Sequence, residues 1–302
     1  MKAYKGFDKD LKCRDFQYEI GKEYEEKEAK ACEKGFHACT NPLNVLQYYP
    51  PCYENRYCEV EQDGEFSENG DDSKVASTKI KIGNEISLEE LIQAAIDKSG
   101  ESGICSVNTD DYTMAENAEN CSIALNKGYG SMATNVGHYS LATTTRSFTI
   151  AANTGDYSVA WSQAAHSIAA NIGDGSAALG DGYRSIAANT GNRSAAISYG
   201  EDTVAINVGS ESTAINKAVE SVALNIGDRA KASVTEEGSI AIATGIQSKA
   251  KGGLGSAIVL VERTTLNGYR YPISNIKAAI VDGEKIKADT WYTLKNGEFV
   301  EA

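Results

Sequence analysis

Three residues near the N-terminus carry side chains that bind transition metals: Cys32, His37 and Cys39. Thiolate and imidazole groups are ligands that zinc prefers. Their C-x4-H-x-C spacing, followed by Cys52 and Cys58, does not match the paired short spacings of structural zinc sites. We therefore predict that these thiols are buried or incidental, and that the chain holds no metal and no other cofactor.

Acid and base chemistry is equally sparse, because the chain has three histidines. His138 and His166 fall at repeat positions otherwise filled by Asp, Asn, Glu or Ser, so we expect them at exposed corners. We expect His37 to be partly buried and hydrogen-bonded to backbone. No nucleophile, base and acid stand in a recognisable arrangement, and the sequence predicts no catalytic residue.

Charge and cysteine usage limit the compartment and the partners. The net charge of -13 disfavours direct binding to nucleic acid; it is typical of a solvated acidic surface, with a basic protein partner or mimicry of nucleic acid as alternatives. Seven cysteines, an odd number, indicate reduced thiols. The N-terminal residues lack the apolar stretch of a secretory signal, and no run is apolar enough to span a membrane. We expect a cytoplasmic protein with no membrane partner.

The middle of the chain must position any functional surface, and it is repetitive. Sixteen consecutive nine-residue units open at Thr113 and each carries a small residue at position one and alanine at position three. Positions two and four are mostly branched and apolar. Alternation of this kind, followed by Asn-x-Gly, predicts a strand and then a turn.

A second period of eighteen residues sets the size of one coil. Asparagine at position five recurs in alternate units, and glycine follows two residues later. Stacked coils would let each amide bond to its neighbours in a ladder, and the glycine would supply the positive φ of a tight corner. The predicted ladder consists of Asn117, Asn135, Asn153, Asn171, Asn189, Asn207 and Asn225.

The fold class that follows is mainly β, with a parallel two-sheet β-solenoid of about eight coils. At about 4.8 Å per coil the rod is roughly 38 Å long. We expect the branched residues to form the interior because they bury more apolar area, which leaves the alanines on smooth outer faces for lateral packing. The alternative is a thin core of Ser and Ala, with an apolar stripe exposed to a partner.

The flanks suit a solenoid whose ends must be covered. We predict an α+β domain over 1–82, a capping helix over 83–103 that covers the first coil, the solenoid over 104–252, and an antiparallel β cap over 253–302. The helix begins with a Ser87 and Glu90 capping box. The cap has strand pairs around the turns Asn267-Gly268, Asp282-Gly283 and Asn296-Gly297.

Units such as SVALNIGDR and TVAINVGSE resemble the repeats in the β-roll head domains of trimeric autotransporter adhesins. The resemblance implies a roll that associates with copies of itself, with a trimer favoured. The nine-residue plan is also similar to the calcium-binding β-rolls of secreted toxins, with Asp156, Asp174 and Asp228 at corners. Asn192 and Ser210 interrupt that series, so we predict no calcium ladder.

The N-terminal segment, with YKG, GFHACTNP and a later V-E-x-D-G, resembles the ADP-ribosyltransferase pattern. That resemblance implies nicotinamide dinucleotide binding by Tyr4, His37 and Glu59 or Glu61. The two ends of the chain also resemble uncharacterised phage and prophage proteins.

Three functions follow from these observations. We expect a non-enzymatic, oligomeric binding protein, encoded by a phage or mobile element, that occupies a host protein in the bacterial cytosol and inhibits a defence or nucleic-acid-handling complex. A trimeric fibre or adhesin-like protein is the first alternative, and a divergent ADP-ribosyltransferase acting through residues 1–82 is the second. The predicted interaction patch consists of Tyr157, Trp161, Tyr183 and Tyr199.

Overall fold

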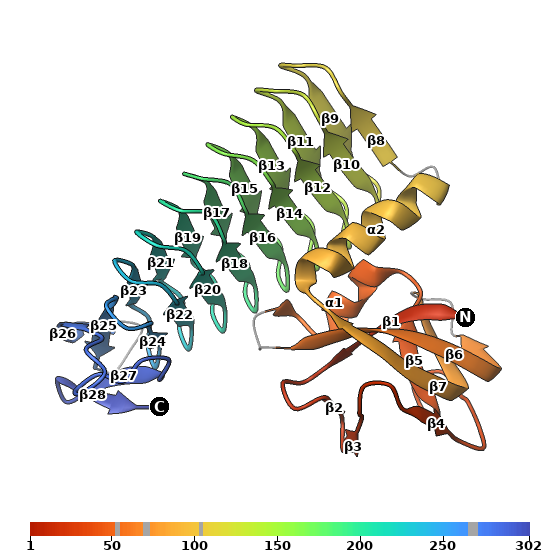
Figure 1. The fold of residues 1–302 in the computed structure, drawn as a ribbon, viewed down its shortest axis with the longest axis horizontal. Helices are drawn as coiled ribbons and strands as arrows, with labels where there is room; N and C mark the ends of the chain where they lie inside the picture. The colour runs from red at the N-terminus through yellow and green to blue at the C-terminus, as the bar shows by residue number, and fades with distance from the viewer. Residues whose placement is uncertain (52–54, 69–72, 103–104, 265–270) are drawn as a thin grey trace. The chain divides into compact units, whose positions relative to one another are not determined.

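The chain divides into two units in the computed structural model, Met1–Cys105 and Ser106–Ala302. The structure describes residues 1–51, 55–68, 73–102, 105–264 and 271–302. The second unit is the predicted parallel β-solenoid, and its strands stack coil upon coil (Figure 1). Along the chain, strands alternate between two sheets, and those from β9 to β24 pair in parallel with strands eighteen residues away, as Asn153 does with Asn171; β25 pairs with β23 at seventeen residues. Since each coil contributes two strands, β8 to β25 make about nine coils.

The two sheets differ in how they end. The eleven-stranded sheet contains β8 (Cys105–Asn108), β10 (Ile123–Asn126), β12 (Leu141–Thr144), β14 (Val159–Ser162), β16 (Ala177–Gly180), β18 (Ala195–Ser198), β20 (Thr213–Asn216), β22 (Lys231–Val234), β24 (Lys249–Lys251), β27 (Tyr292–Lys295) and β28 (Glu298–Glu301). The ten-stranded sheet contains β9 (Met114–Asn117), β11 (Met132–Asn135), β13 (Ile150–Asn153), β15 (Ile168–Asn171), β17 (Ile186–Asn189), β19 (Val204–Asn207), β21 (Val222–Asn225), β23 (Ile240–Ala243), β25 (Ala257–Arg263) and β26 (Ile273–Ile280).

The interior of the solenoid is lined by small residues, and the expectation of a branched core is wrong. The position-three alanines, from Ala115 to Ala250, are at most 1% exposed and form one continuous core. The side chains of positions one and five, mostly Ser and Asn, are buried beside them. Short strands joined by tight corners hold the two sheets close together, so only small side chains fit between them. The branched residues at positions two and four therefore point outward.

The predicted asparagine ladder is also different from the expectation, because its bonds go to backbone. The Asn153 amide Nδ2 donates to the Ser140 carbonyl oxygen across the coil at 3.1 Å, and its Oδ1 accepts from the Gly155 N–H at 3.0 Å. Five further members, from Asn135 to Asn225, make both bonds with the equivalent groups. Asn117, in the outermost of these coils, accepts from the Glu119 N–H. Buried carbonyl and N–H groups at the corners need partners, and one asparagine amide serves both.

The corner glycines do not have the positive φ that we expect from the sequence. The left-handed residue lies two places later, as at Tyr139 and Tyr157 with φ of 56° and 54°. Glycine is required because neighbouring coils approach closely: a Cβ added to Gly155 would lie 2.1 Å from the carbonyl oxygen of Gly137.

The C-terminal residues form the predicted antiparallel cap. Strand β26 pairs antiparallel with β25, and β27 pairs with β28 through a two-residue turn with φ of 52° at Asn296 and 76° at Gly297. Asp282-Gly283 does not join two strands, and that part of the prediction is wrong. The Asp282 carboxylate instead accepts three backbone N–H groups and closes a loop. The predicted Asn267-Gly268 turn lies outside the described residues.

The N-terminal unit is built on a small antiparallel barrel. Its sheet has the order β4-β7-β5-β1-β6, and an additional β7–β6 pairing closes it. The strands are β1 (Lys2–Phe7), β4 (Glu23–Glu25), β5 (Phe36–Cys39), β6 (Arg56–Glu68) and β7 (Lys74–Ile86), and β2 (Lys12–Cys13) with β3 (Phe16–Gln17) forms a separate hairpin. Phe7, Val60, Ile80 and Ile82 fill the barrel.

Three helical segments accompany the barrel. They are η1 (Pro42–Asn44), α1 (Val45–Tyr48) and α2 (Leu88–Ser102). The predicted capping box begins α2, with the Glu90 N–H donating to Ser87 Oγ at 3.1 Å and the Ser87 N–H donating to Glu90 Oε2 at 2.7 Å. Helix α2 contacts η1 within the N-terminal unit; coverage of the first coil stays a prediction. In the part of the chain that the structure describes, no helix is long and apolar enough to cross a membrane.

Candidate functional site

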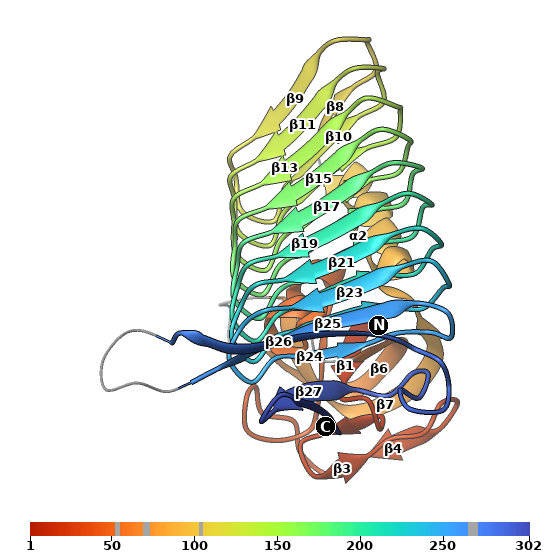
Figure 2. The same cartoon turned by 90° about the vertical axis from the view of Figure 1, so that its left-hand side faces the viewer.

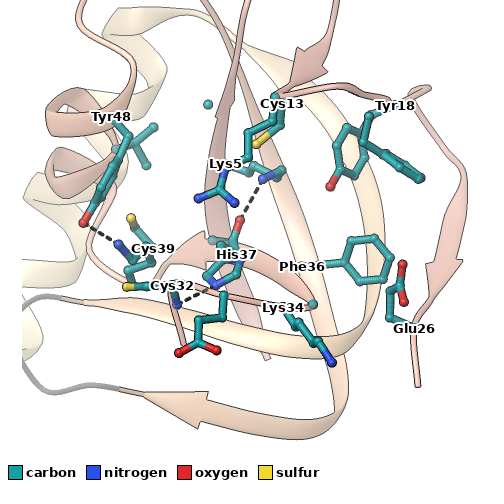
Figure 3. A pocket seen from close by; sticks show the side chains of 18 of the residues that line it. Lys5, Cys13, Tyr18, Glu26, Cys32, Lys34, Phe36, His37, Cys39 and Tyr48 are labelled. Carbon is teal, nitrogen blue, oxygen red and sulfur yellow. Dashed lines mark hydrogen bonds between the residues drawn. The ribbon is translucent and has the colours of Figure 1, made fainter. Parts of the chain in front are cut away.

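A pocket of about 1010 Å³ opens in the N-terminal unit (Figure 3). Strands β1 and β5 form its floor, and the segments around residues 13–18 and 26–35 form its sides together with α1 and the residue after it. Barrel closure brings Lys5 of β1 and Lys74 of β7 to the same cavity although 69 positions separate them. The pocket could therefore not be located by spacing in the sequence.

Lys5 is the most unusual residue in the pocket. Its side chain points into the barrel and is only 4% exposed. The ammonium Nζ donates to the His37 carbonyl oxygen at 2.8 Å and lies 5.4 Å and 5.2 Å from the ring centroids of Phe7 and Tyr18. No carboxylate among the described residues forms an ion pair with it. Burial lowers the pKa of Lys5, and the electrostatic interaction and hydrogen bond with Cys13 only partly oppose this.

His37 lies beside Lys5 on β5. Its ring Nε2 accepts a hydrogen bond from the Cys32 N–H at 2.9 Å, so this nitrogen carries no proton. Burial, followed by the charges of Lys5 and Lys74, lowers the pKa of His37. The imidazole is neutral at pH 7 and holds the loop at Cys32, whose φ is 66°. The prediction of a partly buried histidine bonded to backbone agrees with this geometry.

Two further cations reach the same pocket. The Lys74 ammonium donates to Tyr48 Oη at 2.9 Å and lies 4.2 Å from the centroid of that ring. Arg14 lines the pocket with a φ of 54°, and within the described chain its guanidinium forms no hydrogen bond or ion pair. The charges of Lys5, Lys74 and Arg14 all act on His37, which shows that their electric fields overlap there.

The candidate metal ligands and dinucleotide-binding residues divide between the pocket and its surroundings. Cys32, His37 and Cys39 all line the pocket, but the described residues contain no metal-binding group of His, Cys, Asp and Glu. Tyr4 lines it as well, opposite Glu59 in the β1–β6 ladder. Glu59 pairs with Lys2 at 2.8 Å, and neither Glu59 nor Glu61 lines the pocket.

Trp161 and Tyr199 of the predicted aromatic patch lie on the eleven-stranded sheet and at its edge. Trp161 is 6% exposed and its indole N–H donates to the Asp181 carboxylate at 2.6 Å. The ring of Tyr199 lies beneath the Lys217 ammonium, 4.7 Å from the centroid. Both aromatic residues therefore have partners within the solenoid.

Tyr157 and Tyr183 occupy corners on opposite edges of the solenoid, so the four residues do not form one patch. Tyr157 stacks on Tyr139 with ring centroids 5.5 Å apart. Tyr183 ends an aromatic ladder that sequence reasoning missed, although its members follow the strands of alternate units. The ladder consists of Tyr112, Tyr129, Phe148, His166 and Tyr183, each ring contacting the next at 4.9 to 5.9 Å.

Figure 2 shows the strands of the ten-stranded sheet side by side. The outward positions of six consecutive strands, β13 to β23, hold no charged residue. At the equivalent positions the eleven-stranded sheet has Asp181, Lys217 and Lys231. Ile172, Val208 and Ile226 are 62%, 45% and 47% exposed. We name this surface the apolar face; it consists of Ile150, Ala152, Thr154, Ile168, Ala170, Ile172, Ile186, Ala188, Thr190, Val204, Ile206, Val208, Val222, Leu224, Ile226, Ile240, Ile242 and Thr244.

Comparison with known proteins bears on the N-terminal unit. A family model described as "Domain of unknown function (DUF7666)" matches residues 1–94, which include the barrel and every pocket residue. The curated proteins and the solved structures contain no match to the chain. The protein thus combines an N-terminal DUF7666 domain with a β-solenoid.

Proposed function

We propose that the protein is a non-enzymatic binding protein that associates with a second copy of itself through the apolar face. One observation carries the proposal: eighteen neighbouring outward positions have no charge, in a chain whose net charge is -13. Contiguous exposed apolar surface of this size is typical of an interaction site. Association through this face buries no charged side chain of the face, so it avoids the desolvation cost of burying charge.

The dimensions of the face suit a pair of copies. Six strands about 4.8 Å apart, each contributing roughly 17 Å of its length, give a planar area of about 500 Å² per copy. A pair would bury on the order of 1,000 Å², the lower bound for a specific interface. Both copies present the same strand spacing, so the ridges of one sheet can pack between the ridges of the other about a two-fold axis.

The number of copies in the oligomer distinguishes a dimer from an adhesin-like trimer. A single flat face favours two copies, whereas the resemblance to adhesin heads implies three. Smooth outer alanine faces do not support a trimer, because the alanines lie inside the solenoid. The proposed further partner is a host protein with a basic surface, inside a bacterial cell; the acidic charge and the phage-like ends support it.

The mass in solution tests self-association. We expect a mass of about twice 32.2 kDa for the wild type. Ile226→Lys places a charge on the apolar face, and Thr235→Lys places one at the same repeat position of the eleven-stranded sheet. Ile226→Lys should be monomeric, and Thr235→Lys should behave as the wild type.

A wild type that remains monomeric at its highest soluble concentration contradicts the proposal. A trimer that Ile226→Lys dissociates and Thr235→Lys does not supports the same face with the adhesin-like count. Equal dissociation by both variants places the interface elsewhere.

A further inference from the structure

The geometry points to a ligand site for a small aromatic anion in the pocket of the N-terminal domain, where a carboxylate or phosphate group would lie among Lys5, Arg14 and Lys74. This site is independent of the apolar face. It is formed by a different unit of the chain, and its ligand is a small molecule instead of a second copy.

Lys5 has no carboxylate counter-ion among the described residues. Lysine is almost never fully buried unless it is paired. Here the partners are a carbonyl oxygen, a thiol and two aromatic rings, and none of them carries a full negative charge when the thiol is protonated. Lys5 as a whole is 4% exposed and lies on the wall of the cavity, so an anion bound in the cavity would supply the missing negative charge beside it.

Lys5, Arg14 and Lys74 line one pocket of a protein whose net charge is -13. Arg14 has five N–H donors, and within the described chain none of them is used. Lys74 is oriented toward the pocket by Tyr48 Oη. Four acidic residues also line the pocket, Asp15, Glu26, Glu28 and Glu33, and within the described chain none of them forms an ion pair with Lys5 or Arg14; Glu28 and Glu33 pair with Lys34 and Lys30. Guanidinium and ammonium groups together suit carboxylate and phosphate oxygens.

An aromatic wall of the pocket suits the apolar part of the ligand. Phe16, Tyr18 and Phe36 line the same cavity, and their rings contact one another at 4.7 to 6.4 Å. Phe16 is 43% exposed, so part of this aromatic cluster is open to solvent. A flat apolar ring fits such a wall by edge-to-face contact. The ligand class is therefore an aromatic carboxylate or an aromatic phosphate ester.

Calorimetric titration of the full-length protein tests the site, with phenyl phosphate, benzoate, inorganic phosphate and benzyl alcohol as probes. We expect phenyl phosphate or benzoate to bind at one site per chain, and the tighter of the two identifies the anion. Inorganic phosphate should bind more weakly than phenyl phosphate, and benzyl alcohol should not bind. Lys5→Met and Arg14→Gln should each weaken binding roughly tenfold or more.

Lys2→Met, on the same strand but outside the pocket, is the matched control and should bind as the wild type. If Lys5→Met does not fold, the exposed Arg14→Gln decides, since its side chain supports no core contact. The inference is overturned if no anion binds, if benzyl alcohol binds as well as the anions, or if both pocket variants retain wild-type affinity.

Discussion

Glycine is required at several corners of the solenoid because backbone atoms of the neighbouring coil lie close to it, and not because the corner needs a positive φ. The glycines at position seven of alternate units have ordinary φ angles, yet each faces the carbonyl of the coil before it. A Cβ added to Gly191 would lie 2.0 Å from the carbonyl oxygen of Gly173, a distance that no side chain occupies. Only glycine fits at position 191, because the hydrogen bonds between strands hold the backbone of the neighbouring coils in place.

We therefore expect Gly191→Ala to destabilise the solenoid by more than about 2 kcal/mol, as overpacking against a fixed backbone does. Gly180→Ala is the control, because its Cβ would meet Ser185 Cβ at an ordinary 3.5 Å. Thermal unfolding followed by circular dichroism measures the difference. Equal midpoints for the two variants would show that neighbouring coils can move apart.

The buried ammonium of Lys5 gives a second prediction at this scale. Burial lowers the pKa of Lys5 in the folded state, so the unfolded chain binds the proton more tightly. The lysine therefore lowers the free energy of unfolding at pH values below its ordinary pKa of about 10.4. Lys5→Met should raise the free energy of unfolding of the N-terminal unit at pH 7. The gain should shrink as pH rises from the lowered folded pKa through about 10.4, and it should vanish above that pH, where the wild-type lysine is neutral in both states. Urea unfolding at several pH values measures this, and a gain that is constant with pH would sink the explanation.

In the antiparallel C-terminal cap, the side chain of Glu262 joins neighbouring strands by hydrogen bonds. The Glu262 carboxylate on β25 accepts from the backbone N–H groups of Asn296 and Gly297 at 2.7 and 2.9 Å, and from Asn275 Nδ2 at 2.7 Å. It ties the β27–β28 turn to β25 and β26. Those backbone hydrogen bonds lower the pKa of Glu262.

A carboxyl with a lowered folded pKa stabilises the fold above its unfolded pKa of about 4.3, and the contribution is lost as pH falls through the folded value. In a titration followed by NMR, the Gly297 amide should shift with a midpoint below 4.3. The shift should vanish in Glu262→Gln and persist in Glu284→Gln, whose side chain lies in an exposed loop. A midpoint at or above 4.3 would contradict stabilisation of the cap by the Glu262 carboxylate.

At the same scale, the elements differ in how well the sequence predicts them. The eighteen-residue coil, the Ser87 capping box and the Asn296-Gly297 turn follow from local patterns, and all are confirmed. Which side chains point inward cannot be predicted from the local pattern, because the residues at odd repeat positions are small and those at even positions are mostly apolar, so either set could form the interior. The distance between the sheets decides it, and that distance depends on corners whose geometry is not evident in composition.

The pocket could be predicted even less. Lys5 and Arg14 precede the barrel strand β7 that brings Lys74 to them, and no short motif links the three. His37 is singled out by its residue type and does lie in the pocket. Its bond to the Cys32 N–H depends on a loop conformation with positive φ at Cys32, which the sequence does not signal.

For the whole solenoid, the repeat predicts which deletions the fold tolerates. Removal of residues 167–184 deletes one complete coil and joins His166 to Ser185, so every later strand keeps its sheet. Removal of residues 176–184 alone deletes half a coil and moves every later strand to the opposite sheet.

We expect the full-coil deletion to retain cooperative melting and, with five of the six strands of the apolar face still on one sheet, to form the wild-type oligomer at higher protein concentration. The half-coil deletion should become monomeric, because it divides the apolar face between the two sheets. Melting curves and mass measurement decide this. Retention of the oligomer by the half-coil variant would argue against an interface on one sheet.

The eighteen-residue separation of paired strands also affects how the solenoid folds during synthesis. Each strand pairs with one that was synthesised a single coil earlier, as Ile186 pairs with Ile168. Loop closure over so short a distance costs little entropy. A growing chain can therefore add coils one at a time onto a finished template, beginning before the C-terminal cap has left the ribosome, and the unpaired edge that could recruit a wrong strand is never more than one coil wide.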